Sequence, residues 1–464
     1  MRTHKHIILQ RPISITAFIV LFMVTSCNPN KNNKEFSGAD GEVQIMTLNP
    51  GHFHAALIQK DRINQVDPEV HVYAPEGPDL DLHLARIEGF NSQNESSAKW
   101  DVNVRTSPEY MRLMLDERPG NVVITAGNNR KKTEYIKRSV DSGLNVLSDK
   151  PMAIDKEGWE LLVSAFESAN KNDVLLYDIM TERYNVISIL QQRLAQNRDL
   201  FGELEEGSIE NPAIIKEAVH HLYKQVSGEP LRRPPWYFDV EQQGEGIVDV
   251  STHLIDLAMW GSFPGKIIDY KTDVQMLQAN RWATEISEDQ FEKITGMNKF
   301  LGYLQDQLVD GLLPLYSNGD IFFTLNGHHT KISVTWDYEA PSGGGDSQYS
   351  LMRGTLSDIV IRQNNLYIEP SPQVDHQKLL RALEEAINDL QDDYPGLSYE
   401  ENQNGWKLII PDQFYLGHES HFGKVAEAYF GYLVSGELPE WEIPNMITKY
   451  YITTTAREMA MDTD

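Results

Sequence analysis

The regular alternation of short apolar runs with amphipathic segments between residues 41 and 182 constrains this chain more than any other feature. The runs with strand character lie at residues 42–48, 70–74, 100–104, 121–127, 144–149 and 174–180. Helical patterns or polar loops separate them, for example over 52–63, 130–143 and 155–171. Strands joined by helical crossovers form a parallel sheet with helices on both faces. The pattern therefore predicts a doubly wound parallel sheet over residues 41–182 of this α/β chain.

The pattern changes after residue 183. Longer alternating runs at 213–228, 267–277, 319–327, 330–340 and 357–370 are typical of antiparallel strands. Helical patterns remain at 184–197, 376–390, 421–436 and 446–461. Because 464 residues exceed one ordinary core, we expect a second domain over 183–464. It is predicted to be α+β, with a large open, mostly antiparallel sheet and the C-terminal helices.

The first 27 residues predict export. Positive charges precede an apolar run from residue 13 to 24, which is too short to span a membrane and fits a signal peptide. The run ends in VTSC, and Cys27 is the only cysteine of the chain. We predict a lipidated Cys27 at the mature N-terminus, with a flexible tether over 28–40. The alternative is an ordinary cysteine in a cleaved leader.

The acidic balance of the chain bears on its partners. The formal net charge is −27, and the acidic residues are spread along the sequence. Such a chain has no basic surface to release counterions from phosphates, so we expect no nucleic-acid partner. Beyond the N-terminal lipid anchor, no other contact with the membrane is expected.

The first strand–helix turn, TLNPGHFHAAL, lies where a dinucleotide fold binds diphosphate. Of the G-x-G-x-x-G pattern it keeps Gly51, while Asn49 and His54 stand at the other glycine positions. Glu76 is the nearest acid to the end of the second strand, and the next arginine is Arg86, so NAD is favoured over NADP. An ordinary turn without a nucleotide is the alternative. The candidate cofactor-binding residues are Asn49, Gly51, His52, Phe53, Glu76, Ala126, Gly127, Asn128, Asp149, Lys150 and Pro151.

Lys150 is the first candidate for chemistry. It stands in VLSDKPM at the carboxyl end of the fifth apolar run, on the side where ligands bind in such sheets. Pro151 restricts the backbone of Lys150 to extended angles and permits a cis bond. Both effects fix the direction of the ammonium group, although a strand-end lysine is often only a solvated charge.

The second candidate is the segment GEGIVDVSTHLIDLAMW. On a helix Asp249 and His253 share one face, so a carboxylate would lie beside an imidazole. That arrangement orients the ring and suits a general base near neutral pH. In the alternative interpretation, Asp249 interacts with its own helix and His253 is a satisfied core residue.

Together these motifs resemble the Gfo/Idh/MocA family of NAD(P)-dependent oxidoreductases. The family's Glu-Lys-Pro corresponds to Asp149, Lys150 and Pro151, and its Gly-rich loop with Asp and His to the segment around Asp249 and His253. The resemblance implies that Lys150 contacts the reacting hydroxyl and the nicotinamide. It also implies that His253 takes the hydroxyl proton, while Asp249 orients His253 or binds sugar. The eroded glycine turn departs from the family pattern and puts the choice of cofactor in question.

Other substrate contacts are predicted from RRPPWYFDVEQQGEG, which leads into the second motif. Its aromatic and charged side chains suit a carbohydrate. The substrate-binding candidates are Lys150, Arg233, Trp236, Tyr237, Asp249 and His253. A structural loop with Trp236 in a core is equally compatible. GHESHF around His418 has no third partner at ligand spacing, so no metal site is predicted.

Three functions remain open. We favour an exported, membrane-tethered oxidoreductase that oxidises a hydroxyl of a sugar, glycoside or polyol with a tightly held NAD. The same residues also suit net glycoside cleavage by oxidation and elimination. The third possibility is a carbohydrate-binding lipoprotein without activity. Because relatives commonly pair through the open sheet, we also expect a homo-oligomer.

Overall fold

The computed structural model describes residues 36–93, 99–226, 229–341 and 345–462, which belong to one compact unit starting at Phe36. The predicted leader, Cys27 and the first part of the tether lie outside the described residues. Within the described ranges, no helix is both long enough and apolar enough to cross a membrane. The two-domain division at residue 183 stays a prediction, although the two main sheets lie on either side of it.

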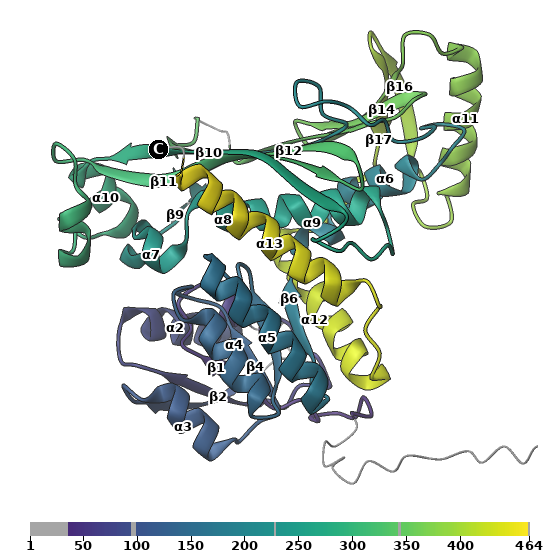
Figure 1. The fold of residues 1–464 in the computed structure, drawn as a ribbon. Coiled ribbons are helices and arrows are strands. Elements are labelled where there is room, and N and C mark those ends of the chain that lie inside the picture. The colour runs from purple at the N-terminus through teal and green to yellow at the C-terminus, as the bar shows by residue number, and fades with distance from the viewer. Residues whose placement is uncertain (1–35, 94–98, 227–228, 342–344, 463–464) are drawn as a thin grey trace, which may run out of the picture. The chain divides into compact units, whose positions relative to one another are not determined.

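The first sheet has six parallel strands in the order β3-β2-β1-β4-β5-β6 (Figure 1). Its strands are β1 (Ile45–Leu48), β2 (Glu69–Ala74), β3 (Asp101–Thr106), β4 (Val122–Thr125), β5 (Asn145–Asp149) and β6 (Leu176–Ile179). This order reverses between β1 and β4, so the ligand crevice of such a sheet lies at the carboxyl ends of those strands. The predicted doubly wound parallel sheet is confirmed.

Helix α1 is shorter than the sequence pattern predicts. It covers only His54–Leu57, whereas a helix over 52–63 was expected. The reason is tertiary: the indole of Trp100 donates to the carbonyl oxygen of Gln59 at 2.6 Å, and Gln59 is completely buried. Trp100, which stands just before β3, therefore holds the Gln59 carbonyl oxygen in the core, where it does not continue the helix.

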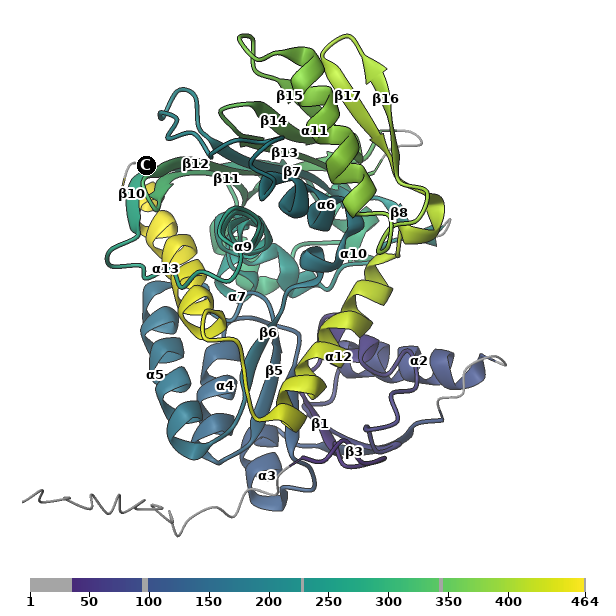
Figure 2. The same ribbon diagram turned by 90° about the vertical axis from the view of Figure 1, so that its right-hand side faces the viewer.

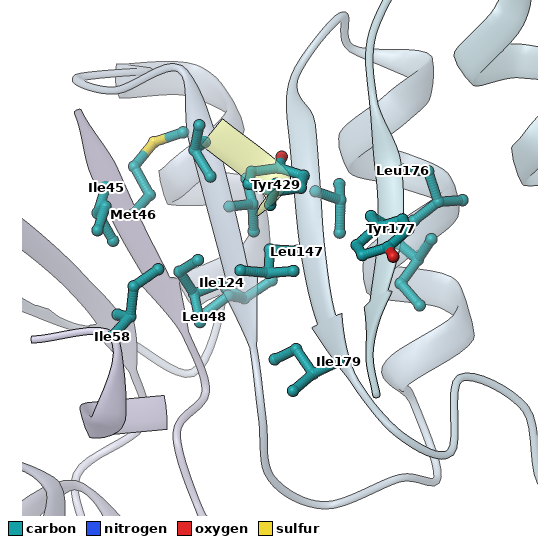
Figure 3. Packing of buried hydrophobic residues seen from close by; sticks show 14 of the residues in the cluster. Ile45, Met46, Leu48, Ile58, Ile124, Leu147, Leu176, Tyr177, Ile179 and Tyr429 are labelled. Atoms are coloured by element: carbon teal, nitrogen blue, oxygen red, sulfur yellow. The ribbon is translucent and has the colours of Figure 1, made fainter. Parts of the chain in front are cut away.

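Helix α12 (His418–Ser435) packs on the first sheet although it comes from the far end of the sequence. Figure 2 shows α12 on one side of this sheet, with α4 (Lys132–Asp141) and α5 (Lys156–Asn172) on the other. Tyr429 of α12 lies among the buried residues of the strands, and its ring stacks on Tyr177 of β6 at 6.4 Å (Figure 3). Phe422 contacts the ring of His54. Helix α12 thus covers sheet surface near the short α1.

The second sheet has nine strands in the order β10-β11-β12-β7-β13-β14-β15-β17-β16. They are β7 (Ile214–Tyr223), β10 (Val274–Ile286), β11 (Leu313–Leu325), β12 (His328–Glu339), β13 (Ser347–Arg353), β14 (Ser357–Arg362), β15 (Asn365–Pro370), β16 (Ser398–Asn402) and β17 (Gly405–Ile409). Only β7 and β12 pair in parallel; the other seven neighbouring pairs are antiparallel. The predicted open, mostly antiparallel sheet is confirmed.

Helices bury their apolar sides against this second sheet in two clusters. The helices of this part are α6 (Val186–Ala195), α7 (Val240–Gln243), α8 (Gly246–Asp249), α9 (Ser251–Ser262), α10 (Glu288–Thr295), α11 (His376–Asp389) and α13 (Glu442–Met461). The remaining helices are α2 (Pro78–Ser92) and α3 (Tyr110–Glu117) beside the first sheet. A two-stranded sheet is formed by β8 (Gln225–Val226) and β9 (Glu229–Pro230).

Buried charges tie the two parts together. Arg183, in the 3-10 turn Thr181–Tyr184 after β6, donates to both oxygens of Asp256 on α9 at 2.6 and 2.7 Å. Arg183 also pairs with Glu442 of α13, and Lys449 of α13 lies 2.8 Å from Asp256 and 2.7 Å from Asp178 of β6. Burial alone would raise the pKa of Asp256, but the two cations outweigh it and lower that pKa. Asp256 is thus a structural anchor between the sheets.

We predict that Asp256→Asn destabilises the fold by roughly 3–5 kcal/mol, because removing one partner leaves buried cations uncompensated. Urea unfolding of both proteins measures the difference. Asp116→Asn is the control: Asp116 pairs with Arg112 at 2.7 Å on an exposed helix face, where a pair contributes about 0–1 kcal/mol. Because the Asp256 pKa lies below its ordinary value, the wild type should keep this contribution at neutral pH and lose it only in acid. Equal losses in the two variants would contradict the assignment.

Candidate active site

The carboxyl end of β5 presents two consecutive charged residues to different partners. Asp149 is 3% exposed and ends the strand, and Lys150 follows with a cis bond to Pro151. Successive side chains of an extended segment point in opposite directions. Asp149 therefore contacts the turn after β1, whereas Lys150 reaches residues of the second sheet region.

Lys150 forms a buried ion pair with Asp249. Its ammonium group donates to Asp249 Oδ1 at 2.6 Å, and Gln243 donates to the other carboxylate oxygen at 3.0 Å. The side chains of Lys150 and Asp249 are only 12% and 8% exposed. Burial would raise the pKa of Asp249, but the Lys150 ammonium beside it holds that pKa below its ordinary value. The pair fixes the lysine at the edge of the parallel sheet.

The charge of Lys150 also acts on His253, but His253 is not hydrogen-bonded to Asp249 as the sequence predicted. Burial, and next the positive charge of Lys150, lower the pKa of His253 well below its ordinary value, so the ring is neutral at neutral pH. Asp249 bonds to Lys150 and Gln243 instead of His253. The backbone keeps helical angles at Val250 between α8 and α9 (φ −70°, ψ −34°), so the choice of partner reflects the charge of Lys150 and not a break in the helix. Among the described residues, buried His253 Nδ1 has no hydrogen-bond partner.

Asp149 is the centre of a second cluster. His52 Nδ1 lies 3.0 Å from Asp149 Oδ2, and His54 Nδ1 lies 3.1 Å from Asp149 Oδ1. The other ring nitrogen of His54, Nε2, is 3.0 Å from Nε2 of His418 at the start of α12. Burial would raise the pKa of Asp149, but the two histidines hold it well below the ordinary range. Burial lowers the pKa of His52 to about 4. At neutral pH the carboxylate is anionic and His52 neutral.

Lys132 of α4 contacts the main chain at the same strand end. Its side chain is completely buried, and its ammonium group donates to the carbonyl oxygen of Asp149 at 3.2 Å. Burial lowers the pKa of Lys132 to about 8, while Asp149 acts in the opposite direction. This lysine was not singled out in the sequence, where it lies within an ordinary charged helix.

The turn after β1 packs directly against the tip of β4. The amides of Gly51 and His52 donate to the carbonyl oxygen of Ala126 at 3.1 and 3.2 Å. A Cβ on Gly127 would lie 2.7 Å from the Asn49 carbonyl oxygen and 2.8 Å from the Gly51 nitrogen. Only glycine permits this approach. Asn49 itself has a left-handed backbone, with φ of 47°.

Of the other predicted cofactor residues, one is exposed and two contact neighbouring side chains. Glu76 follows β2, is exposed, and has no hydrogen bond or ion pair within the described part of the chain. Phe53 lies under the guanidinium of Arg86, 5.9 Å from its ring centre. Asn128 is engaged, because its amide donates to the side chain of Gln242 at 2.6 Å.

Trp236 is not placed as a free aromatic platform. Its indole donates to Asp79 Oδ2 at 2.7 Å, and the ring lies against Gly51, whose added Cβ would be 3.3 Å from Cζ2. With 9% exposure, Trp236 packs over the first turn. Its contact with a carbohydrate stays a prediction.

Arg233 and Tyr237 form a different group near β7 and β12. The Arg233 guanidinium lies 4.9 Å from the Tyr237 ring centre and 5.0 Å from that of Trp336, and it donates to main-chain carbonyls of β7. His220 of β7 stacks on Trp336 at 4.8 Å and lies 3.1 Å from Asp346 Oδ2. Burial lowers the pKa of His220 and raises that of Tyr237; Lys224 and then Lys150 add to the first shift, and Asp249 adds to the second. These aromatics are thus electrostatically coupled to the Lys150–Asp249 pair.

Some residues of the site were not predicted. Gln243 lies in the motif segment but has no distinctive spacing, and Asp346 follows a Gly-rich loop that carries no pattern. His418 and His54 are separated by 364 positions, so no local signal joins them. The sequence motifs do lead to Lys150, Asp249 and His253, which the structure brings into one region.

The residues of this region fit a nicotinamide dinucleotide at its two ends. Glu76 is exposed, and no described residue pairs with it, at the position where a ribose hydroxyl is bound in such folds. At the other end, His253 keeps an unpartnered buried nitrogen near the ammonium of Lys150. The turn that would bind the diphosphate departs from the G-x-G-x-x-G pattern, and two of its amides already donate to the Ala126 carbonyl oxygen. A diphosphate would rely on the remaining backbone of that turn.

The comparisons with known proteins establish the family. The model described as "Putative oxidoreductase C terminal domain" matches residues 190–461, more than half of the chain. A solved structure described as "a putative oxidoreductase from Parabacteroides merdae ATCC 43184" is 47% identical, with a TM-score of 0.91, over 93% of this chain and 100% of that one. The chain belongs to this family of Gfo/Idh/MocA-type oxidoreductases.

More distant structures share the fold. A levoglucosan dehydrogenase in complex with NADH is 12% identical, with a TM-score of 0.58, over 90% of this chain and 97% of that one. GenD2 from gentamicin A biosynthesis, in complex with NAD, is 13% identical, with a TM-score of 0.55, over 93% and 98% of the two chains. A search of curated proteins found no match.

We predict that Gly127→Ala displaces the first turn, because its Cβ would overlap the backbone of Asn49 and Gly51. Overpacking of this kind costs about 1–3 kcal/mol. Urea unfolding should show that loss, and NAD titration followed by calorimetry should show weaker binding. Gly89→Ala in α2 is the matched control, since its Cβ meets nothing within 4 Å. A Gly127→Ala protein as stable as the Gly89→Ala protein would refute the close packing.

Proposed function

We propose that this protein oxidises a hydroxyl group of a sugar, glycoside or related polyol by hydride transfer to a tightly held NAD. The observation that carries the proposal is a fixed ammonium that acts electrostatically on a neutral imidazole. Lys150 is held by Asp249 at 2.6 Å, burial and then Lys150 lower the pKa of His253, and within the described part of the chain His253 Nδ1 has no hydrogen-bond partner.

The chain's own residues divide the work. Lys150 donates a hydrogen bond to the reacting hydroxyl and stabilises the alkoxide that develops as its proton leaves. His253, neutral at the working pH, accepts that proton. Asp249 acts through Lys150: it fixes the direction of the amine, and Gln243 holds the carboxylate in place. The bound nicotinamide supplies the hydride acceptor.

The choice of NAD over NADP follows from Glu76. A carboxylate at the end of β2 accepts hydrogen bonds from the two ribose hydroxyls and repels a 2′-phosphate. Arg86, the nearest arginine along the chain, lies against the ring of Phe53. The substrate class is supported by the aromatic group of Tyr237, Trp336 and His220, since sugar rings pack on such faces.

We further propose that the protein works outside the cytoplasm, anchored by lipid at Cys27 on a bacterial membrane. This part rests on the leader sequence alone. Free NAD is scarce there, so the cofactor is expected to stay bound and to be recycled between two substrates. The large open sheet is the proposed contact between copies of the chain in a homo-oligomer.

The cofactor proposal predicts that acid denaturation of freshly purified protein releases nearly one dinucleotide per chain, measured by mass spectrometry. Glu76→Ala should lower the affinity for NAD and reduce the preference over NADP, because the ribose hydroxyls lose an acceptor. Glu69→Ala, at the opposite end of β2, is the control. Protein that is empty and binds neither dinucleotide would refute this function.

The catalytic roles predict that Lys150→Met and His253→Ala each lower kcat by about 10²–10⁴-fold with a substrate found by screening sugars. Because the pKa of His253 is lowered, its neutral form persists on acidification. The acid limb of the wild-type pH–rate profile should therefore lie below pH 6.5, and His253→Ala should lose it. Lys156→Met, an exposed residue of α5, is the control.

Retention of turnover in both variants would disprove the assignment. The turnover assay with the screened sugar also separates oxidation from cleavage. Accumulation of a keto sugar supports oxidation. Net hydrolysis without a change in nicotinamide absorbance would instead show that the protein is a redox-neutral glycosidase.

A further inference from the structure

We propose that His52, His54 and Asp149 form a binding site for a divalent transition-metal ion, with Zn²⁺ as the favoured occupant. Two imidazoles and one carboxylate are the donor set of catalytic zinc sites, and this set also suits Fe²⁺. The site goes beyond the proposed oxidation and does not require a dinucleotide. It departs from the sequence prediction of no metal, because its three ligands come from two segments far apart in the chain.

The distances carry the proposal. The Nδ1 atoms of His52 and His54 lie 3.0 and 3.1 Å from the two Asp149 oxygens, and one ligand atom from each residue lies within 4.8 Å of the others. Ligand atoms about 2.0–2.2 Å from a tetrahedral ion are roughly 3.3–3.5 Å apart. Small side-chain adjustments therefore bring all three atoms onto one ion.

The ligands stand on well-fixed backbone. His54 is 5% and Asp149 3% exposed, whereas His52 is partly exposed toward solvent. The His52 amide is tied to Ala126, and β5 is paired on both sides by β4 and β6. A site with buried ligands on fixed elements and one partly exposed ligand combines preorganisation with a route of entry for the ion.

His418 supplies the outer contact that such a site needs. A histidine that binds metal through one nitrogen normally donates its other N–H to a neighbouring acceptor, which fixes the ring. His54 has this arrangement: with Nδ1 on the ion, its Nε2–H donates to Nε2 of His418 at 3.0 Å. With His54 as a metal ligand, the proton of its ring is therefore assigned to Nε2, and Nε2 of His418 is the acceptor. Helix α12 thus positions a ligand of the first turn from the far end of the chain.

The charges nearby are compatible with a cation. Asp149 contributes one negative charge, and the ammonium of Lys150 is already compensated by Asp249. Lys132 contacts the carbonyl oxygen of Asp149, on the backbone side of the residue. Glu182 approaches His418, with 3.9 Å between Oε1 and Nδ1, and adds a carboxylate to the outer ring of groups.

Three protein ligands leave a position for water or a substrate oxygen. Because Asp149 and Lys150 are consecutive, an ion here would lie beside the proposed reaction centre. Its chemical contribution would be to bind and polarise a substrate oxygen as a Lewis acid. The alternative is a hydrogen-bonded cluster without metal, in which Asp149 accepts from both Nδ1–H groups.

Calorimetric titration of the chelator-treated full chain with Zn²⁺ alone tests the proposal. We expect one high-affinity equivalent for the wild type, and loss of that equivalent in the His52→Ala/His54→Ala double variant. His71→Ala is the matched control, since His71 of β2 also lies 3.8 Å from a carboxylate oxygen, and this variant should bind Zn²⁺ as the wild type does. A wild type that binds no Zn²⁺, Fe²⁺ or Co²⁺, or a folded double variant that binds normally, would overturn the site.

Two measurements cover the case in which the double variant does not fold. X-ray absorption of the Zn²⁺-loaded wild type should show nitrogen and oxygen neighbours with scattering from two imidazoles, and a shell without imidazole would refute the ligand set. His418→Ala should weaken binding about 10–100-fold, because only the outer contact is lost. None of these readouts involves dinucleotide or substrate, so failure of the metal site leaves the proposed oxidation standing, and the reverse also holds.

Discussion

The end of strand β5 is the constraint on which the whole site depends. Asp149 and Lys150 are adjacent, and extended backbone directs adjacent side chains to opposite directions. Asp149 is therefore committed to the turn after β1, and Lys150 to Asp249 in the helix α8. One strand end thus holds two clusters of polar groups, each buried and each satisfied by a different part of the chain. A shift of this strand by one residue would exchange the two and disrupt both.

The second dependence is on the C-terminal helices. A long helix after β1 is absent, because Gln59 is held by Trp100, and α12 covers neighbouring sheet surface with Phe422 and Tyr429. Helix α13 adds Glu442 and Lys449 to the buried charge network around Arg183 and Asp256. The last segments of the chain therefore complete the core of the first sheet, as well as the environment of His54.

The sequence predicts those features that rest on local periodicity. The parallel strands, the antiparallel strands from β7 onward and the strand-end position of Lys150 all follow from apolar patterns and chain order. The relation between Asp249 and His253 could not be predicted from helical spacing, which considers only neighbours on the same helix. The opposite charge of Lys150, which comes from a distant part of the chain, provides a stronger partner for the carboxylate. Contacts such as His54 with His418 depend on tertiary packing, which single-sequence patterns do not encode.

The arrangement of charges explains why two different chemistries can coexist at one strand end. Lys150 and Asp249 form an ion pair without net charge, so Asp249 weakens the repulsion that the ammonium alone would exert on a cation at the neighbouring cluster. The negative charge of that cluster is that of Asp149, which lies within hydrogen-bond distance of two imidazoles and has the Lys132 ammonium on its main-chain carbonyl. Burial and the ammonium of Lys150 lower the pKa of His253, so its ring stays neutral. A buried carboxylate with two imidazole nitrogens beside it attracts a cation, while the neutral His253 imidazole accepts a proton from a hydroxyl. The separation of these roles follows from the pairing of Lys150 with Asp249, since an unpaired ammonium at this position would repel a cation from the site beside it.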